Sequence, residues 1–278
     1  MPPASAYAAP TAPPARTPTR RRARLSSRRP GLGLGLSTLY LSVIVLIPLA
    51  AVVVKAVTQS PSAFWASVTS PVALRALELS LGVSVLVSLI GAVMGTVVAW
   101  VLVRDDFPGQ RILNALIDLP FALPTVVAGI TLLSLYGPDS PFGVHLAFTR
   151  AAVLVALLFV TLPFVVRSVQ PVLMELDRGV EEAAASLGAS SGVTFRRIVL
   201  PALRPAILSG AALAFARSVG EIGSLIVIAV NVPIASTVIY DNIEQDSPQA
   251  AASLSLVLIV LSLLVLVIIR RVGGRVAH

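Results

Sequence analysis

Of the ionisable residues within or near the long apolar runs of this sequence, three stand out as the first candidates for chemistry. Arg217 and Glu221 lie in the apolar stretch from about 202 to 230, and Asp118 lies near the start of another. Charged side chains in such stretches are costly in lipid, so they usually pair with one another or mark a functional site. Arg217 and Glu221 are four residues apart, so on a helix both project from one face. Asp118 lies either inside the membrane or near its cytoplasmic interface.

Other kinds of chemistry are excluded by the residues that the chain lacks. It has no cysteine, so disulfides, iron–sulfur clusters and thiolate metal sites are impossible, and its two histidines, His145 and His278, are far apart. Its only lysine, Lys55, does not lie in a phosphate-binding Gly-rich loop, so the chain cannot form the Walker A site of an ATPase. We therefore expect no catalytic residue, no metal site and no bound cofactor in this chain.

The composition predicts an all-α polytopic membrane protein. The chain has 278 residues, of which 56% are hydrophobic and 12% charged, and its mean hydropathy is +0.91. A soluble domain carries about twice that share of charge. Several runs of roughly 19 or more apolar residues are long enough to cross a bilayer as helices. We predict a bundle of six transmembrane helices at about 36–57, 77–103, 112–135 (broken by Pro120 and Pro124), 151–169, 202–230 and 252–269.

The arginines predict how these spans are oriented. Residues 1–35, the turn at 104–111, the loop at 171–204 and the tail at 271–278 carry most of them. Cytoplasmic loops are enriched in basic residues, so both termini are predicted to be cytoplasmic. The loops at 58–74, 137–149 and 231–250 are then external.

The segment 1–35 holds seven arginines and no acidic residue. Such a composition predicts a disordered cytoplasmic tail that lies near anionic lipid. A nucleic-acid-binding arm is a poorer explanation beside a membrane span, and the following apolar run is too long for a cleaved secretory signal. An organellar transit peptide remains an alternative.

The loop at about 171–200 is a polar island between apolar runs and predicts two short helices. Asp177 can cap the first helix, Glu181 and Glu182 lie near its N-terminus, and Gly188 is a typical C-terminal stop. Val180, Ala184 and Leu187 recur at helical spacing and form an apolar face. The second helix begins at Ser190 or Ser191 and carries Phe195, Arg196, Arg197, Ile198 and Val199, and Pro201 then opens the next apolar run.

This loop resembles the cytoplasmic loop of bacterial ABC-importer permeases. The resemblance rests on Glu182-Ala183-Ala184, Gly188, Ile198 and Leu200-Pro201, which occur at the family spacing without a gap. It implies a coupling helix that docks into a groove on a separate ATPase subunit. The alternative is an amphipathic loop that lies on the membrane surface. The predicted ATPase-coupling residues are Glu181, Glu182, Ala183, Ala184, Gly188, Arg196 and Pro201.

Three further stretches resemble the T-type permease subunit of sulfate/thiosulfate importers. They are Asp118–Thr125, Leu135-Tyr136-Gly137-Pro138 and Ala214–Ser224, the last running on towards Asn231. The resemblance covers about 75–270, which would form the permease transmembrane domain, and it departs from the family pattern at Ile222, where an aromatic residue is common. Molybdate permeases share the Gly-Glu-x-Gly element, so import of molybdate or tungstate remains an alternative. A non-transport membrane scaffold is an alternative of a different class.

The resemblance also implies partners, a location and a path. The chain would form a heterodimer with a W-type permease and work with two ATPase subunits, which bind ATP and Mg, and with an extracytoplasmic sulfate-binding protein. Its location would be the bacterial plasma membrane, with a plastid membrane as an alternative. Arg217, Glu221 and Asn231 are then candidates either for the translocation path or for pairing between helices.

Overall fold

The structure, a computed structural model, describes residues 31–274, and these residues form helices without any strand. They belong to two compact units that meet in sequence between Ile47 and Pro48. The first unit contains α1 (Gly31–Leu41) and a π-helical segment, η1 (Ser42–Leu46). The prediction of a disordered tail to residue 35 was therefore wrong for residues 31–35, which extend the apolar helix. The rest of that tail lies outside the described residues.

Two prolines each follow a π-helical segment. Pro48 follows η1, and Pro201 follows η2 (Phe195–Val199). In each case the residue before the proline donates its N–H five residues back, Ile47 to Ser42 and Leu200 to Phe195. A proline has no N–H and crowds the carbonyl four residues earlier, and a widened π turn relieves that crowding. The helix therefore continues through Pro201.

The second unit begins with short helices where a loop was predicted. After α2 (Ile47–Val57) come α3 (Pro61–Val68) and the long helix α4 (Pro71–Arg104). Ser60 and Ser70 accept hydrogen bonds from the backbone N–H groups of Ala63 and Ala73, so each caps a helix that starts with proline. Serine before proline is a helix-start signal, and it explains why the predicted loop at 58–74 is largely helical.

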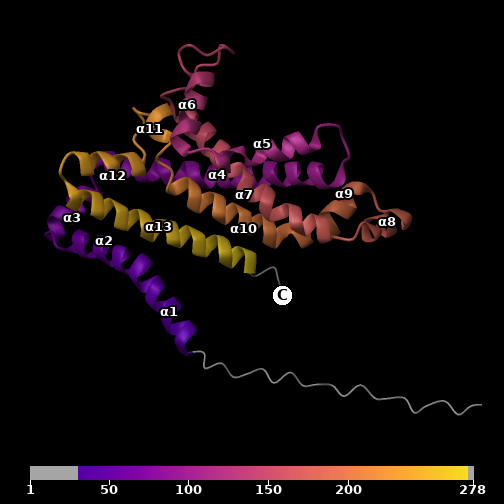
Figure 1. The fold of residues 1–278 in the computed structure, drawn as a ribbon, viewed down its shortest axis with the longest axis horizontal. Helices are drawn as coiled ribbons and strands as arrows, with labels where there is room; N and C mark the ends of the chain where they lie inside the picture. The colour runs from indigo at the N-terminus through magenta and orange to yellow at the C-terminus, as the bar shows by residue number, and fades with distance from the viewer. Residues whose placement is uncertain (1–30, 275–278) are drawn as a thin grey trace, which may run out of the picture. The chain divides into compact units, whose positions relative to one another are not determined.

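Three helices form the centre of this unit. α4, α7 (Arg150–Glu175) and α10 (Leu200–Val219) lie side by side (Figure 1). Glycines let them approach closely: a Cβ atom on Gly95 of α4 would lie 2.8 Å from the Val165 side chain, and one on Gly210 of α10 would lie 2.8 Å from the Val165 Cα. Gly91 also faces Val165. The small residues Gly91 and Gly95 of α4 thus serve close packing within the chain.

Two helix breaks meet beside this centre. α5 (Gln110–Ala122) and α6 (Thr125–Tyr136) are bent by 117°, because Leu123, which precedes Pro124, is extended. The predicted span 202–230 is also broken, since α10 ends at Val219 and only the short α11 (Leu225–Ile228) follows. Between these helices, Gly223 lies against Thr125, and the place of a Cβ on Gly129 is 2.7 Å from the Ser224 carbonyl oxygen.

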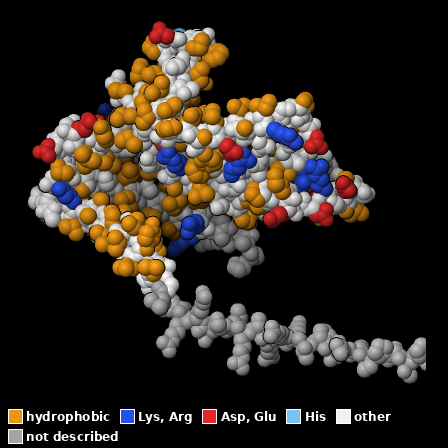
Figure 2. Space-filling model, viewed as in Figure 1, with side chains coloured by type: hydrophobic (Ala, Val, Ile, Leu, Met, Phe, Trp, Pro, Cys, Tyr) orange, Lys and Arg blue, Asp and Glu red, His pale blue; other side chains and the backbone are white. Residues whose placement is uncertain are grey.

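The last helices also extend beyond their predicted bounds. α12 (Ala235–Glu244) lies inside the predicted external loop, and α13 (Pro248–Gly274) continues into the predicted C-terminal tail. Five helical stretches are long and apolar enough to span a membrane, and counting the bent α5–α6 pair as one span gives up to six. Hydrophobic side chains are spread over the face seen in Figure 2, and charged ones are most frequent towards the end that carries α8 (Arg178–Ser186). The fold is a polytopic helical membrane protein.

Candidate functional site

The helix α8 is built by local capping at both ends. The Asp177 carboxylate accepts a hydrogen bond of 2.8 Å from the Gly179 N–H, as the sequence predicted. At the other end, Ala189 donates its N–H to the Ala184 carbonyl, and Gly188 donates to Ala185. This is the Schellman arrangement, and Gly188 takes the left-handed conformation it requires, with φ of +84°. The second short helix, α9 (Ser191–Thr194), follows directly.

An internal ion pair holds α8 against the end of α4. Arg104 Nη2 lies 2.5 Å from Glu181 Oε1, and the side chain of Arg104 is only 9% exposed. The Arg104 guanidinium also donates to the Leu176 carbonyl and lies 5.7 Å from the centre of the Trp100 ring. Arg178 donates a second anchoring hydrogen bond, of 2.9 Å, to the Val103 carbonyl. Glu181 is therefore engaged within the chain, and it positions α8.

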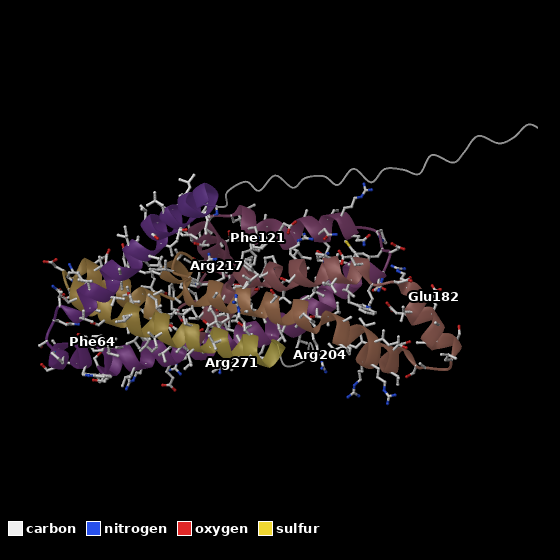
Figure 3. The ribbon with its side chains drawn as sticks, turned by 90° about the horizontal axis from the view of Figure 1, so that it is seen from below. Phe64, Phe121, Glu182, Arg204, Arg217 and Arg271 are labelled. Carbon is white, nitrogen blue, oxygen red and sulfur yellow. The ribbon has the colours of Figure 1, made fainter. Side chains whose placement is uncertain are left out.

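Glu182 and Ala183 of α8, with Leu187 and Gly188 of the turn that follows it, form an open surface, which we call the α8 surface. All four are exposed, and Leu187 is 89% exposed although it is a large apolar side chain. Figure 3 shows Glu182 at the end of the bundle. Ala184 is half-buried. A short helix that is anchored on one side and apolar on its open side suits docking to another protein.

The other two predicted coupling residues, Arg196 and Pro201, lie beyond α9. Both are exposed, Arg196 on η2 and Pro201 in the first turn of α10. The second helix begins at Ser191 after the N-cap residue Ser190, as predicted. It does not end before Pro201, because η2 joins α9 to α10 in one helical stretch, Ser191–Val219. Arg196 and Pro201 are thus carried by the end of a membrane-spanning helix.

Arg217 and Glu221 form an ion pair, but not on one helix face. Arg217 Nη2 lies 2.6 Å from Glu221 Oε2, although α10 ends at Val219 and Glu221 lies beyond it. The second Glu221 oxygen accepts hydrogen bonds from the backbone N–H and the hydroxyl of Ser224, at 2.8 and 3.0 Å. The Glu221 side chain is 1% exposed, and that of Arg217 is 33% exposed. The predicted single helix fails here because Glu221 takes over the role of a cap for the next turn.

A second charged cluster joins α5 to α7; the sequence singled out its acidic member, Asp118, but not its partner Arg167. Arg167 donates two hydrogen bonds to the Asp118 carboxylate, at 2.7 and 2.6 Å. It also donates to the side chain and the backbone carbonyl of Asn114 and to the Gln170 side chain. The partners are about 50 residues apart in sequence, so no local spacing pointed to them; an arginine in a second apolar run was the available signal.

Asn231 is not part of either cluster. It lies in the exposed turn between α11 and α12, and its side chain makes no hydrogen bond with any residue of the described range. The structure therefore brings Arg217 and Glu221 together and places Asn231 elsewhere.

Comparisons with known proteins support the assignment of the fold. Residues 88–278 match the family model described as "Binding-protein-dependent transport system inner membrane component". A bacterial alginate ABC transporter, solved with its oligosaccharide-bound periplasmic protein, has a chain that superposes with a TM-score of 0.75 at 16% identity, covering 88% of this chain and 94% of that one. An inward-facing methionine ABC transporter gives 0.63 at 19% identity, covering 79% and 100%.

Curated relatives are much closer in sequence. "Sulfate transport system permease protein CysT" of Synechocystis sp. is 44% identical over 242 residues, which is 83% of this chain and 85% of the relative. The protein of the same name from Escherichia coli is 41% identical over 266 residues, covering 90% and 96%. A "Probable sulfate transport system permease protein cysT" of the alga Nephroselmis olivacea is 42% identical over 245 residues, covering 84% and 86%. Because the family model matches more than half of the chain and these relatives match over most of it, the chain belongs to the family of binding-protein-dependent transport system inner membrane components.

Proposed function

We propose that the chain is a permease subunit of an ABC importer for sulfate and thiosulfate. The observation that carries this proposal is the identity of 41–44% to sulfate transport permeases over more than four fifths of the chain. The alginate and methionine transporters support the same fold but share too little sequence to indicate the substrate. The chain itself hydrolyses no ATP, because its one lysine, Lys55, is not part of a Walker A loop.

The α8 surface would receive the force of ATP hydrolysis from a separate ATPase. Leu187 and the flanking alanines supply an apolar contact, and Glu182 supplies a charge at the rim. Movement of α8 would pass to α4 through the Arg104–Glu181 pair and to α10 through η2. α4, α7 and α10 pack around Val165, so they would respond as one body. Arg196 and Pro201 would contribute through the same helix end.

The partners follow from this role. The chain would pair with a W-type permease, bind two ATPase subunits that hold ATP and Mg, and receive its anion from an extracytoplasmic sulfate-binding protein. The alginate transporter solved with a periplasmic protein supports the last partner. Both termini would be cytoplasmic and the membrane would be the bacterial plasma membrane, while algal relatives keep a plastid membrane as the alternative.

Growth on defined sulfur sources tests the substrate. A strain that lacks the gene is expected to fail on sulfate or thiosulfate as the only sulfur source and to grow on cysteine, and the gene supplied in trans restores growth. Normal growth on sulfate together with loss of a molybdenum-dependent activity would indicate a molybdate or tungstate permease instead. The strain must lack any second sulfate importer. A control strain in which only the gene for the sulfate-binding protein is deleted tests this, because it should also fail to grow on sulfate.

Copurification separates an importer subunit from a membrane scaffold. The tagged chain, extracted in mild detergent, is expected to bring down a second permease and an ATPase. A scaffold without a transport role would bring down no ATPase at any ionic strength.

A further inference from the structure

Two arginines in membrane-spanning helices have similar exposure but differ in how many hydrogen bonds they make. The side chain of Arg167 in α7 is 32% exposed and that of Arg217 in α10 is 33% exposed. A guanidinium has five N–H donors. All five of Arg167 are used, in five hydrogen bonds to Asp118, Asn114 and Gln170. Arg167 therefore links α5 to α7 and has no N–H donor left for a ligand.

Arg217 leaves most of its N–H donors without a partner in the described residues. Its contact with Glu221 is its only polar contact within residues 31–274. In the described residues, the buried side-chain nitrogen and oxygen atoms without a hydrogen-bond partner belong to Ser84 and Arg104. The unpaired nitrogens of Arg217 are therefore not buried and reach the molecular surface. Glu221 is held on its other side by Ser224 and is nearly fully buried. The carboxylate thus orients the guanidinium and leaves most of its donors open.

The position of Arg217 lies within the depth of the membrane. Gly210 of α10 packs on Val165 of α7, and the two helices run in opposite directions because α8 and α9 join them at one end. Seven residues beyond Gly210, Arg217 is level with about residue 158 of α7. It is then about 12 Å from the start of α7 and about 25 Å from its end. Figure 3 shows Arg217 part-way along the bundle, between Phe64 at one end and Glu182 at the other.

A free guanidinium at this depth does not face lipid, since the cost would be several kcal/mol. It also lies where two helix breaks meet, because Gly223, two residues beyond Glu221, packs on Thr125 at the start of α6. Breaks of this kind at membrane depth are tolerated only against protein or a water-filled cavity, and transporters use them to build substrate sites.

We propose that the Arg217 guanidinium is a binding station for a tetrahedral divalent oxyanion inside the membrane, and that Glu221 is its positioning residue. The inference rests on the proposed function and names the group that the anion meets. Guanidinium groups bind such oxyanions through paired, charge-assisted hydrogen bonds. The nearby Glu221 charge weakens this binding, so the anion is passed on and not retained. Ser224 keeps Glu221 from turning towards the path.

Transport by the complete reconstituted complex tests the station. With radiolabelled sulfate, Arg217→Gln is expected to lower uptake per assembled complex at least about tenfold, while the binding protein still stimulates ATP hydrolysis. Arg167→Gln is the matched control: it is expected to lower the yield of assembled complex but to leave uptake per complex within about twofold. Equal uptake by Arg217→Gln and wild type, or equal losses in the two variants, would overturn the station.

The double variant Arg217→Met with Glu221→Gln separates a station from a structural pair. The station predicts that the double variant assembles and still fails to move sulfate. Uptake restored to the wild-type rate would show that the two residues serve only to neutralise each other. If the wild-type complex carries thiosulfate but not sulfate, the same variants are assayed with thiosulfate. If it carries only molybdate or tungstate, the proposed substrate is wrong, and the variants are assayed with that anion. If the wild-type complex carries none of these four anions, both the proposed function and the proposed anion site at Arg217 are wrong.

Thiol labelling tests the site without touching Arg217, because the chain has no cysteine of its own. Leu213 is one turn before Arg217 on the same helix face and is 51% exposed, and Leu263 of α13 is a control at 56%. A water-soluble sulfonate reagent is expected to label Leu213→Cys in the assembled complex and to leave Leu263→Cys unlabelled. Absence of labelling at position 213 both with and without nucleotide would contradict a water-filled path at Arg217.

Discussion

The Arg104 guanidinium and the Glu181 carboxylate, 77 residues apart in sequence, lie 2.5 Å from each other where α4 meets α8. The pair attaches the short helix with the open α8 surface to one of the three central helices. Two neighbouring acidic residues therefore have different roles, since Glu181 holds the helix and Glu182 faces outward.

Glu181→Gln is expected to loosen α8. The change leaves the mostly buried Arg104 without its anion, which costs about 1–3 kcal/mol. The assembled complex should melt at a lower temperature, and it should import less sulfate for each ATP hydrolysed. Glu182→Gln is the control with the same chemical change on the open side, and it should melt like wild type. Equal melting temperatures for both variants would show that the Arg104 pair does not support α8.

Glu182→Gln is expected to weaken binding of the ATPase and to leave the permease itself intact. Its carboxylate lies at the rim of the proposed interface, where a charge contributes about 0.2–1 kcal/mol and is screened by salt. Binding of the purified ATPase to the permease heterodimer should fall up to about fivefold in low salt and converge with wild type in high salt. If the loss of ATPase binding is the same at all ionic strengths, the Glu182 side chain contributes through its shape and not through its charge.

Gly188 is expected to tolerate substitution in the order Asn, Ala, Val. Its φ of +84° is left-handed, which costs other residues about 1–2 kcal/mol, least for Asn and most for a β-branched side chain. A Cβ atom here meets nothing within 4 Å in the chain, so any added clash would come from the ATPase. Copurified ATPase, measured at equal permease abundance, should follow this order, and full binding by Gly188→Val would refute a docking role for this turn.

The orientation of the chain is tested by reporter fusions at positions 30, 65, 143, 190, 240 and 275. Positive charge near 104–111 and 196–204 predicts that 30, 190 and 275 report from the cytoplasm. Positions 65, 143 and 240 should report from the other side. A signal from outside the cell at position 190 would mean that α8 lies on the external side of the membrane, where a cytoplasmic ATPase cannot bind it.

The spans and the capping of α8 could be predicted from sequence because their causes are local. Hydropathy over some 20 residues determines a membrane helix, and Asp177 and Gly188 act on the turns next to them. Ser60 and Ser70 carried an equally local signal, the cap before proline, so α3 and the early start of α4 were within reach of the same reasoning.

The charged partners could not be predicted because they depend on packing. Arg104 meets Glu181 and Arg167 meets Asp118 only after α4, α5 and α7 have come together. The end of α10 had a similar cause: Gly220 permits a break, but the break forms because Glu221 is held by Ser224 and Gly223 packs against Thr125 of another helix. The apolar pattern by itself predicted a span that ran past Gly220 to about residue 230.

Uptake of radiolabelled sulfate into proteoliposomes tests the central claim most directly. The vesicles hold this chain, its partner permease and the ATPase, with the binding protein on the outside and ATP inside. The account predicts accumulation of sulfate that requires both ATP and the binding protein and that is lost when Arg217→Gln replaces the wild-type chain. Accumulation that needs neither ATP nor the binding protein, or no accumulation of sulfate by a fully assembled complex, would contradict it.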